Sequence, residues 1–211
     1  KIKQIPEIYY YGLYDGRPCL VFTLYECSLY DYMKHKYVTI EKMNILMVKI
    51  LDIFEKIHNV YVVHRDIKPQ NFMIKNGDIF LIDFGLATFY INEKGEHYEN
   101  DISETIVGSP IYVSINIHKG QHYDCRDDLI SLGYVYLYMI GDPFWVIDDC
   151  ESDLPLYSRH HPYNVLLMEN KSYMNMKEHI SGKSIYRYME YVYHLEYSQK
   201  PKYIPLKNVF L

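Results

Sequence analysis

The chain has 211 residues, of which 49% are hydrophobic and 23% are charged, values that suit one large globular domain. Its formal net charge of -5 argues against a protein that binds nucleic acid or an anionic membrane through bulk charge, and we expect neither as a partner. No signal peptide is apparent, and no apolar run approaches the roughly 20 residues that a membrane span needs.

The four cysteines, Cys19, Cys27, Cys125 and Cys150, lie far apart and form no Cys-x-x-Cys pair. This pattern is typical of reduced thiols, so we expect an intracellular protein of the cytoplasm or nucleus. The 25 tyrosines, together with abundant Ile, Lys and Asn, suggest an AT-rich genome, such as that of a virus acting in its host cell.

The first predicted elements are two strands, residues 8–11 and 19–24, which are rich in aromatic and β-branched side chains. The cluster from Tyr14 to Pro18 between them contains Asp15-Gly16 and favours a turn, so we expect a hairpin. A short helix is predicted over residues 28–34.

A long amphipathic helix is predicted from residue 40 onward. Its apolar residues recur at steps of three and four and so share one helical face: Ile40, Met43, Met47, Ile50, Leu51, Phe54 and Ile57. Thr39 directly precedes this pattern and fits an N-cap, because its hydroxyl can accept a hydrogen bond from an amide of the first turn.

A second hairpin is predicted where Asn76-Gly77 separates two short apolar runs, residues 72–74 and 79–82. Both turn residues tolerate positive φ, which makes this pair the strongest short hairpin signal in the chain.

The second half of the chain is predicted to be helical and irregular. Residues 84–126 are polar and loop-like, whereas residues 129–140 are apolar nearly all round, as expected for a helix at the centre of a fold. Ser184 is the predicted N-cap of a helix that reaches residue 195. A little β structure followed by helices indicates an α+β protein.

The stretch with the clearest chemistry is His64-Arg65-Asp66-Ile67-Lys68-Pro69-Gln70-Asn71, which is followed by Ile82-Asp83-Phe84-Gly85. Asp66 offers a carboxylate that can accept a hydroxyl proton, and Lys68 offers a cation for a transferring phosphate. Asn71 and Asp83 offer oxygen atoms, the ligands that Mg²⁺ prefers. The turn at residues 76–77 folds Asp83 back toward Asn71. The pattern therefore predicts transfer of the ATP γ-phosphate.

The order H-R-D-x-K-x-x-N and then D-F-G is the protein-kinase signature, and the chain resembles that family over essentially its whole length. Residues 20–26, followed by Ser28-Leu29-Tyr30-Asp31, resemble the hinge that connects kinase lobes. Residues 108–116, in which S-I-N replaces the usual A-P-E motif, are similar to the casein kinase one family. Two more stretches share that likeness, residues 126–134 and Lys200-Pro201-Lys202-Tyr203.

The resemblance implies a protein kinase-like fold in which residues 1–211 form one partial kinase domain. Residues 1–26 would be the end of the N-lobe, a remnant β-hairpin and the hinge, and residues 27–211 a mostly helical C-lobe. ATP and Mg²⁺ would be the cofactors and a protein the substrate. Lys68, two residues after Asp66, points to serine and threonine hydroxyls. We expect the protein to be a monomer.

The resemblance also implies roles for single residues. Asp66, Lys68 and Asn71 would be catalytic, Asn71 and Asp83 would bind the metal, and Glu26 would join these two at the nucleotide, where the hinge backbone meets the adenine ring. His64, Arg65 and Asp128 would support the site. Asp128 would accept hydrogen bonds from the backbone of the 64–71 loop, although it also suits a first-turn acid that complements a helix dipole.

Three kinase parts are not found in the sequence. These are a Gly-rich loop before the hinge, a V-A-I-K-type lysine and the helix that supplies its glutamate partner, and we expect them upstream of Lys1. Loss of one preorganised electrostatic donor typically costs about 10²–10³ in rate, so we expect these 211 residues alone to be weak or inactive. The alternative is a pseudokinase or kinase-lobe binding module.

The remaining patterns in the sequence are weaker. A small-molecule phosphotransferase is disfavoured by the full motif set. His118, His122 and Cys125 have a spacing that suits zinc, but no fourth ligand is apparent. Ile111 stands where casein kinase one relatives carry an arginine, so a preference for acidic substrates is not expected. We expect the segment hydroxyls to be unmodified: Ser103, Thr105 and Ser109.

Overall fold

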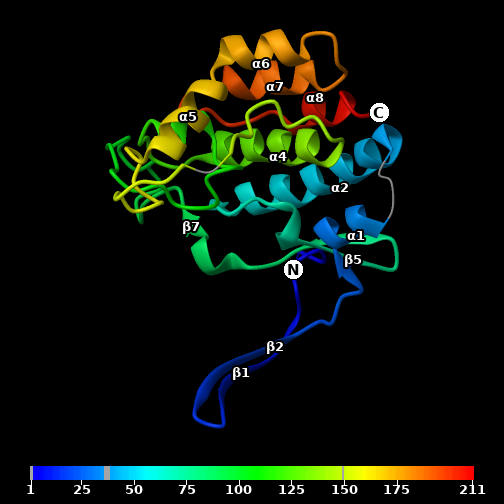
Figure 1. Ribbon diagram of the computed structural model, residues 1–211. Helices are drawn as coiled ribbons and strands as arrows, with labels where there is room; N and C mark the ends of the chain where they lie inside the picture. The colour runs from blue at the N-terminus through cyan, green and yellow to red at the C-terminus, as the bar shows by residue number, and fades with distance from the viewer. Residues whose placement is uncertain (1, 36–38, 149) are drawn as a thin grey trace.

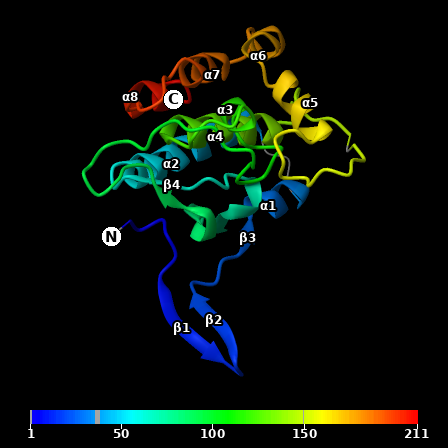
Figure 2. The same ribbon diagram turned by 90° about the vertical axis from the view of Figure 1, so that its left-hand side faces the viewer.

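The computed structural model describes residues 2–35, 39–148 and 150–211, so Lys1 lies outside the described residues. The helices stack into one body, and a single β-hairpin extends away from it (Figure 1). Turning the molecule by 90° shows the same hairpin projecting below α1 and α2, with α6, α7 and α8 on the opposite side of the body (Figure 2).

Helices are the largest class of regular structure in the described chain. In order, they are α1 (Leu29–His35), α2 (Ile40–His58), α3 (Ile115–His118), α4 (Cys125–Met139), α5 (Pro162–Asn170), α6 (Tyr173–Ile180), α7 (Tyr186–Tyr193) and α8 (Tyr203–Asn208). Two short 3₁₀ turns, η1 (Pro69–Asn71) and η2 (Phe84–Leu86), lie at the motif loops.

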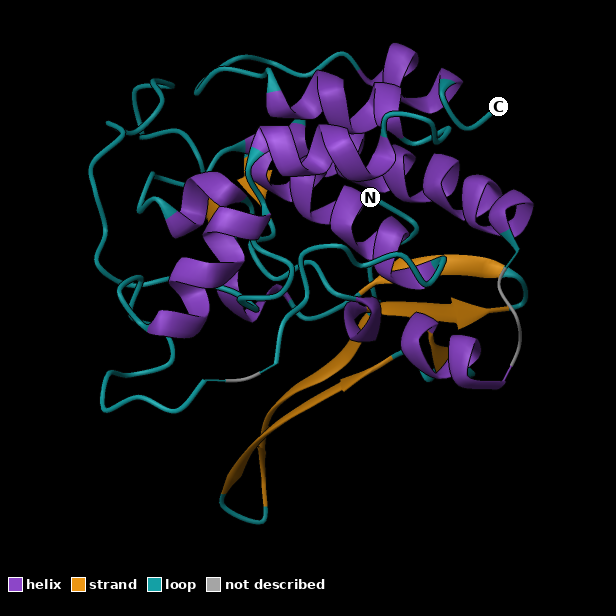
Figure 3. Cartoon of the chain, turned by 45° about the horizontal axis from the view of Figure 1, so that its top comes forward, coloured by secondary structure: helices purple, strands orange, loops and turns teal. Residues whose placement is uncertain are grey.

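The strands form three small antiparallel sheets. They are β1 (Ile8–Tyr14), β2 (Arg17–Phe22), β3 (Cys27–Ser28), β4 (Val62–Val63), β5 (Phe72–Lys75), β6 (Asp78–Leu81) and β7 (Thr88–Phe89). Strand β1 pairs with β2, β3 and β6 flank β5, and β4 pairs with β7. Figure 3 shows these short strands beside a larger group of helices joined by long loops. The α+β class predicted from the sequence is confirmed.

The first hairpin is longer than predicted and is exposed on both faces. Its strands pair from Ile8 opposite Phe22 to Tyr14 opposite Arg17, and Asp15 and Gly16 form the turn with positive φ angles of 49° and 73°. The Tyr11 residue is 81% exposed to solvent and Leu13 is 66% exposed. The hairpin therefore contributes little to the core.

Helix α2 confirms the amphipathic pattern. Thr39 is its N-cap and accepts a hydrogen bond from the amide of Lys42 at 3.3 Å. The predicted face is buried from Met43 to Ile57, and Ile53 is buried as well. Ile40, the first residue of the helix, is 50% exposed to solvent. The first turn of the helix thus extends beyond the core that the rest of α2 covers.

The second hairpin is confirmed at the predicted turn. Asn76 and Gly77 have φ angles of 53° and 74° and connect β5 to β6 in regular antiparallel register. The amide of Asn76 donates a hydrogen bond to the Glu26 carboxylate at 2.8 Å. This turn reverses the chain so that Asp83, two residues after β6, returns toward the 64–71 loop.

Helix α4 is the centre of the fold and begins earlier than predicted. It starts at Cys125 rather than residue 129, and every residue in it except Tyr138 is buried. Its first turn contains Arg126, Asp127 and Asp128, and three charged residues in a row are typical of a loop sequence. These side chains are nonetheless buried because each has polar partners inside the protein.

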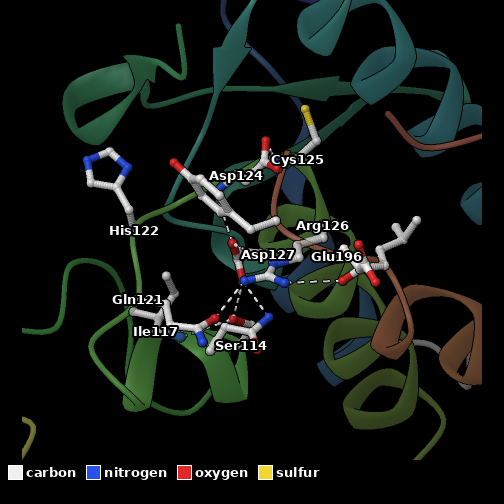
Figure 4. A network of polar contacts seen from close by, with 12 residues as sticks. Ser114, Ile117, Gln121, His122, Asp124, Cys125, Arg126, Asp127 and Glu196 are labelled. Atoms are coloured by element: carbon white, nitrogen blue, oxygen red, sulfur yellow. Dashed lines mark hydrogen bonds and ion pairs between the residues drawn. The ribbon is translucent and has the colours of Figure 1, made fainter. Parts of the chain in front are cut away.

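The start of α4 is held by a polar network (Figure 4). Asp124 and Asp127 form a capping box, and Asp127 also accepts hydrogen bonds from the hydroxyl of Ser114 at 2.5 Å and from the amide of Asn116 at 3.0 Å. Burial raises the pKa of Asp127 to about 6, against the lowering effect of the nearby Arg126 and these donors. The network joins the S-I-N motif to the central helix.

Two expectations for the later chain need correction. Ser184 is not an N-cap, because α7 begins at Tyr186 and its N-cap is Ile185, without a side-chain cap bond. The 84–126 segment is less loop-like than predicted. It contains β7 and α3 and contributes most of a second small core: Val63, Tyr90, Ile106, Val113, Ile117, Tyr123 and Cys125.

Within the described ranges, none of the helices combines the length and apolar character needed to cross a bilayer. The four cysteines form no disulfide with one another in that part of the chain.

Packing between α4 and α7 depends on a glycine. A Cβ atom at Gly133 would lie 2.0 Å from the sulfur of Met189, which is buried. We predict that Gly133→Ala lowers the free energy of unfolding. Overpacking typically costs about 1–3 kcal/mol, whereas the gain in helix propensity is about 1 kcal/mol.

Urea denaturation of Gly133→Ala measures this net loss. The matched control is Gly182→Ala, where an added Cβ would meet no heavy atom within 4 Å, and we expect its stability to stay near that of the wild type. Equal stability of the two variants would contradict the packing argument.

Candidate active site

The carboxylate of Asp66 is the centre of the polar contacts in the 64–71 loop. One oxygen accepts hydrogen bonds from the Lys68 ammonium at 2.6 Å and from the Asn71 side-chain amide at 3.1 Å. The other accepts a hydrogen bond from the Ser109 hydroxyl at 2.8 Å. Asp66 is buried and Lys68 is partly exposed, so the cluster lies at the rim of the body.

These contacts determine the charge state of Asp66. Burial alone would raise its pKa, but the hydrogen bonds from Lys68 and Ser109, the charge of Lys68 and the hydrogen bond from Asn71 outweigh it. The pKa of Asp66 therefore lies below its usual value. At neutral pH the group is a carboxylate that can accept a proton.

Asn71 is oriented by a second bond from the same amide nitrogen, which also donates to the backbone carbonyl of Asp66 at 2.8 Å. Because the nitrogen is used in this way, the side-chain oxygen points away from these two acceptors. The short turn η1 begins with Pro69, whose fixed φ suits the first position of a helical turn.

The peptide groups of Ile82 connect this loop to Asp83. The amide of Ile82 donates to the carbonyl of Asn71 at 2.9 Å, and the carbonyl of Ile82 lies 3.0 Å from the Nε2 atom of His64. The His64 ring also contacts the Phe84 ring edge-to-face, with centroids 4.9 Å apart. Asp83 is therefore held between two residues that both contact the 64–71 loop.

Asp83 itself is exposed and has an unusual backbone. Its φ of 60° and ψ of 72° lie in the left-handed region, and one carboxylate oxygen accepts a hydrogen bond from the amide of Gly85 at 3.3 Å. A mostly apolar cavity of about 540 Å³ lies beside it, lined by Ile5, Pro6, Ile8, Leu20, Phe22 and residues 82–85. The carboxylate thus borders an open space between the body and the β1–β2 hairpin.

Asp128 supports the loop from within the core. Its side chain is wholly buried and accepts hydrogen bonds from the amides of His64 at 2.8 Å and Arg65 at 3.0 Å. These are the backbone contacts that the family resemblance implies for this residue. Because Asp128 lies in the first turn of α4, its charge also complements the positive end of the helix dipole.

Sequence reasoning missed the residues that continue this contact. His58, at the end of α2, lies 3.1 Å from Asp128 through Nε2 and contacts the Tyr203 hydroxyl through Nδ1. A neutral imidazole with its proton on Nε2 satisfies both partners, because it donates to the carboxylate and accepts from the phenol. All three side chains are buried. No local pattern could have revealed a contact between residues so far apart.

Arg65 adopts a left-handed conformation with φ of 69°. Its carbonyl accepts a hydrogen bond from the Tyr123 hydroxyl at 3.2 Å, and its Nε atom donates to the carbonyl of Leu86 at 2.5 Å. A Cβ atom at Gly108 would lie 2.3 Å from the Arg65 carbonyl oxygen, so only glycine permits this close approach.

Glu26 is not in contact with the Asp66 cluster. Its carboxylate accepts a hydrogen bond from the amide of Asn76, and its own amide donates to the carbonyl of Ile74 at 3.0 Å. The amide of Glu26 therefore serves the small sheet rather than a ligand.

The three residues with zinc-like spacing have separate surroundings. His118 contacts Lys171, the His122 ring lies against Tyr98, and the side chain of Cys125 is buried. Among the described residues no cluster of three or more His, Cys, Asp or Glu side chains could hold a metal ion.

Comparison with known proteins identifies the family. Residues 1–199 match the model of the protein kinase domain. The chain is 31% identical to "Probable casein kinase I homolog" of Encephalitozoon cuniculi, over 98% of the chain and 65% of that protein. It is 30% identical to "Casein kinase I homolog 2" and 29% identical to "Casein kinase I homolog 1" of Schizosaccharomyces pombe.

Both fission yeast matches cover 98% of the chain, and they cover 48% and 47% of the respective yeast proteins. The chain thus spans between about half and two thirds of the length of these relatives. With the kinase motifs brought together in the fold, these matches show that the chain belongs to the protein kinase family and is similar to casein kinase I homologues.

Proposed function

We propose that the protein is a serine/threonine kinase that transfers the γ-phosphate of ATP to protein hydroxyls. The observation that carries this proposal is the Asp66 carboxylate, which is ionised, partly shielded from water and oriented by three donors. The names of the casein kinase I relatives support a protein as the substrate.

Each residue of the cluster then has a distinct task. Asp66 accepts the proton of the substrate hydroxyl. The hydroxyl oxygen attacks the γ-phosphorus of ATP, and the bond between this phosphorus and the oxygen that leaves with ADP breaks. Lys68 carries a positive charge 2.6 Å from Asp66, where it can neutralise charge that develops on the transferring phosphate. Ser109 fixes the second oxygen of Asp66 and so limits the directions from which a hydroxyl can approach.

Asn71 and Asp83 fit a magnesium ion. The amide nitrogen of Asn71 is bonded to Asp66, which leaves its oxygen to face a ligand, and Asp83 presents an exposed carboxylate. Both groups are hard oxygen donors, the type that Mg²⁺ prefers. When bound, the ion would neutralise phosphate charge and orient the nucleotide. The remaining backbone groups of the hinge, residues 20–26, would meet the adenine ring.

We also propose that the domain divides after residue 26, with the end of the N-lobe and the hinge before this point and the C-lobe after it. His64, Arg65 and Asp128 would be supporting residues, because their contacts hold the backbone of the 64–71 loop. We further propose that the protein acts inside the cell as a monomer.

The magnesium role predicts the behaviour of Asp83→Asn. This substitution keeps the shape of the side chain but removes its charge, so Mg²⁺ should no longer strengthen ATP binding. Calorimetry with ATP, in the presence and absence of Mg²⁺, measures the effect. We expect Mg²⁺-dependent binding by the wild type and its loss in the variant, with kinase activity lowered by about 10²–10³.

Asp153→Asn is the control for this experiment, because Asp153 is an exposed loop acid. It should bind ATP as the wild type does. If the wild type binds ATP equally well with and without Mg²⁺, the proposed magnesium role is wrong and a binding module is favoured.

The pKa of Asp66 predicts a pH effect of Lys68→Met. The hydrogen bond and charge of Lys68 help to lower the pKa of Asp66, so their removal should raise it. Activity requires the carboxylate and is lost as the pH falls through this pKa. The acid limb of the kcat/KM profile should therefore move to higher pH, and kcat should fall by about 10²–10³.

The matched control is Lys56→Met, since Lys56 lies on the exposed surface of α2 and contacts Gln4. A reduced rate with an unmoved acid limb would show that Lys68 does not set the charge state of Asp66.

A further inference from the structure

The most unusual charged group outside the Asp66 cluster is Lys171. Its side chain is 0% exposed, and among the described residues no ion pair to its ammonium is found, nor does any nearby charge offset the effect of its burial. Lysine is almost never fully buried without a partner, because an ammonium loses its hydration inside a protein. This environment lowers the pKa of Lys171 through burial. The groups that the ammonium binds explain why a lysine is buried at this position.

Two backbone carbonyls and an imidazole surround the ammonium. It donates to the backbone carbonyls of Pro110 and Val113, each at 2.8 Å, and lies 3.1 Å from the Nε2 atom of His118. The Tyr134 ring faces it at 4.9 Å. The same Nε2 atom of His118 lies 3.2 Å from the Pro110 carbonyl, so Lys171 and His118 meet at one backbone oxygen. The two carbonyls are the acceptors that hold the ammonium.

The carbonyls that Lys171 holds belong to residues 109–113, which we call the 109–113 segment. The carbonyl of Ile111, in the same segment, accepts a hydrogen bond from the indole of Trp145 at 2.7 Å. Trp145, between α4 and α5, and Lys171, at the end of α5, therefore hold the 109–113 segment together. They bind three of its five backbone carbonyls. Both Trp145 and Lys171 are wholly buried, which makes the attachment rigid.

The other end of the segment reaches the reacting group. Ser109 is its first residue, and its hydroxyl donates to the Asp66 carboxylate at 2.8 Å. A hydroxyl that hydrogen-bonds to the Asp66 carboxylate would therefore lie beside Ser109. The position of the segment therefore affects both the orientation of Asp66 and the path of a protein substrate.

The backbone of Lys171 is fixed by contacts that involve α5, α7 and α4. This residue is the C-cap of α5, and its amide donates to the carbonyl of Leu167 at 2.9 Å. Its own carbonyl accepts a hydrogen bond from the Tyr193 hydroxyl of α7 at 2.9 Å, and Tyr193 in turn contacts Tyr134 of α4. The ammonium thus extends from a fixed point.

We propose that Lys171 is a positioning residue for the protein substrate. It fixes the 109–113 segment through the carbonyls of Pro110 and Val113, and this in turn fixes Ser109 against Asp66. The proposal rests on the proposed kinase function for its consequence in catalysis, but the structural part can be measured without activity.

The test is Lys171→Met, which keeps the length of the side chain and removes its charge and donors. The matched control is Lys183→Met, because Lys183 pairs with Asp142 at the surface. Hydrogen–deuterium exchange is measured at the amides of Tyr112 and Val113, both of which donate to the carbonyl of Ser109.

We expect exchange at these two amides to become at least about tenfold faster in Lys171→Met, as for the loss of charged hydrogen bonds, and to be unchanged in Lys183→Met. Amides of α2 and α4 should exchange as in the wild type. In the active enzyme, kcat/KM for a protein substrate should fall about tenfold or more, while the affinity for Mg²⁺-ATP stays the same.

Uniformly faster exchange across the body, or no change in the 109–113 segment, would overturn the proposal, because Lys171 would then support the fold in general. If Lys171→Met does not fold, Lys171→Gln replaces it, since its amide keeps two donors without the charge. Failure of both variants to fold also overturns the proposal. Loss of Mg²⁺-dependent ATP binding in the wild type would refute the proposed function instead, and the exchange result would still test the role of Lys171.

Discussion

One buried carboxylate shapes the loop on which the site depends. Asp128 has no exposed surface. Its carboxylate accepts hydrogen bonds from two backbone amides of the 64–71 loop and contacts His58. These bonds fix the peptide on either side of His64, and they hold Arg65 in a left-handed conformation that a non-glycine residue adopts only when its surroundings impose it. A buried carboxylate with several donors is stable as an anion, whereas an unpaired one is not. The loop and the carboxylate therefore require each other.

The remaining contacts of the site follow from this fixed loop. Once His64 is placed, its ring contacts the carbonyl of Ile82 and the ring of Phe84, and Asp83 between them is placed as well. Asn71, at the other end of the loop, holds the amide of Ile82. Asp66 lies between these points and takes its three donors from two separate parts of the chain. Local strain at Arg65 and Asp83 is thus balanced by contacts that converge on one small region.

Local patterns predicted those parts of the fold that are governed by neighbours in the sequence. The periodicity of α2, its cap at Thr39 and the turn at Asn76-Gly77 each depend on interactions within a few residues. The motif set identified the family and the candidate residues for the same reason, since the residues are close in sequence. The start of α4 was misplaced because Asp127 and Asp128 are charged yet buried, and their partners lie outside the helix. Lys171, and Ser109 as a partner of Asp66, could not be predicted, because those contacts join residues 61 and 43 positions apart.

The contact between His58 and Tyr203 has a consequence for the order in which the molecule is built. The two residues are 145 positions apart, and Asp128 lies between them in the sequence. During synthesis, α2 and the 64–71 loop leave the ribosome long before the α8 residue that completes their hydrogen-bond chain. Until then the buried imidazole lacks its phenol partner, so the nascent loop has a weaker support than the finished one. The final shape of the loop is thereby tied to completion of the lobe rather than to local folding.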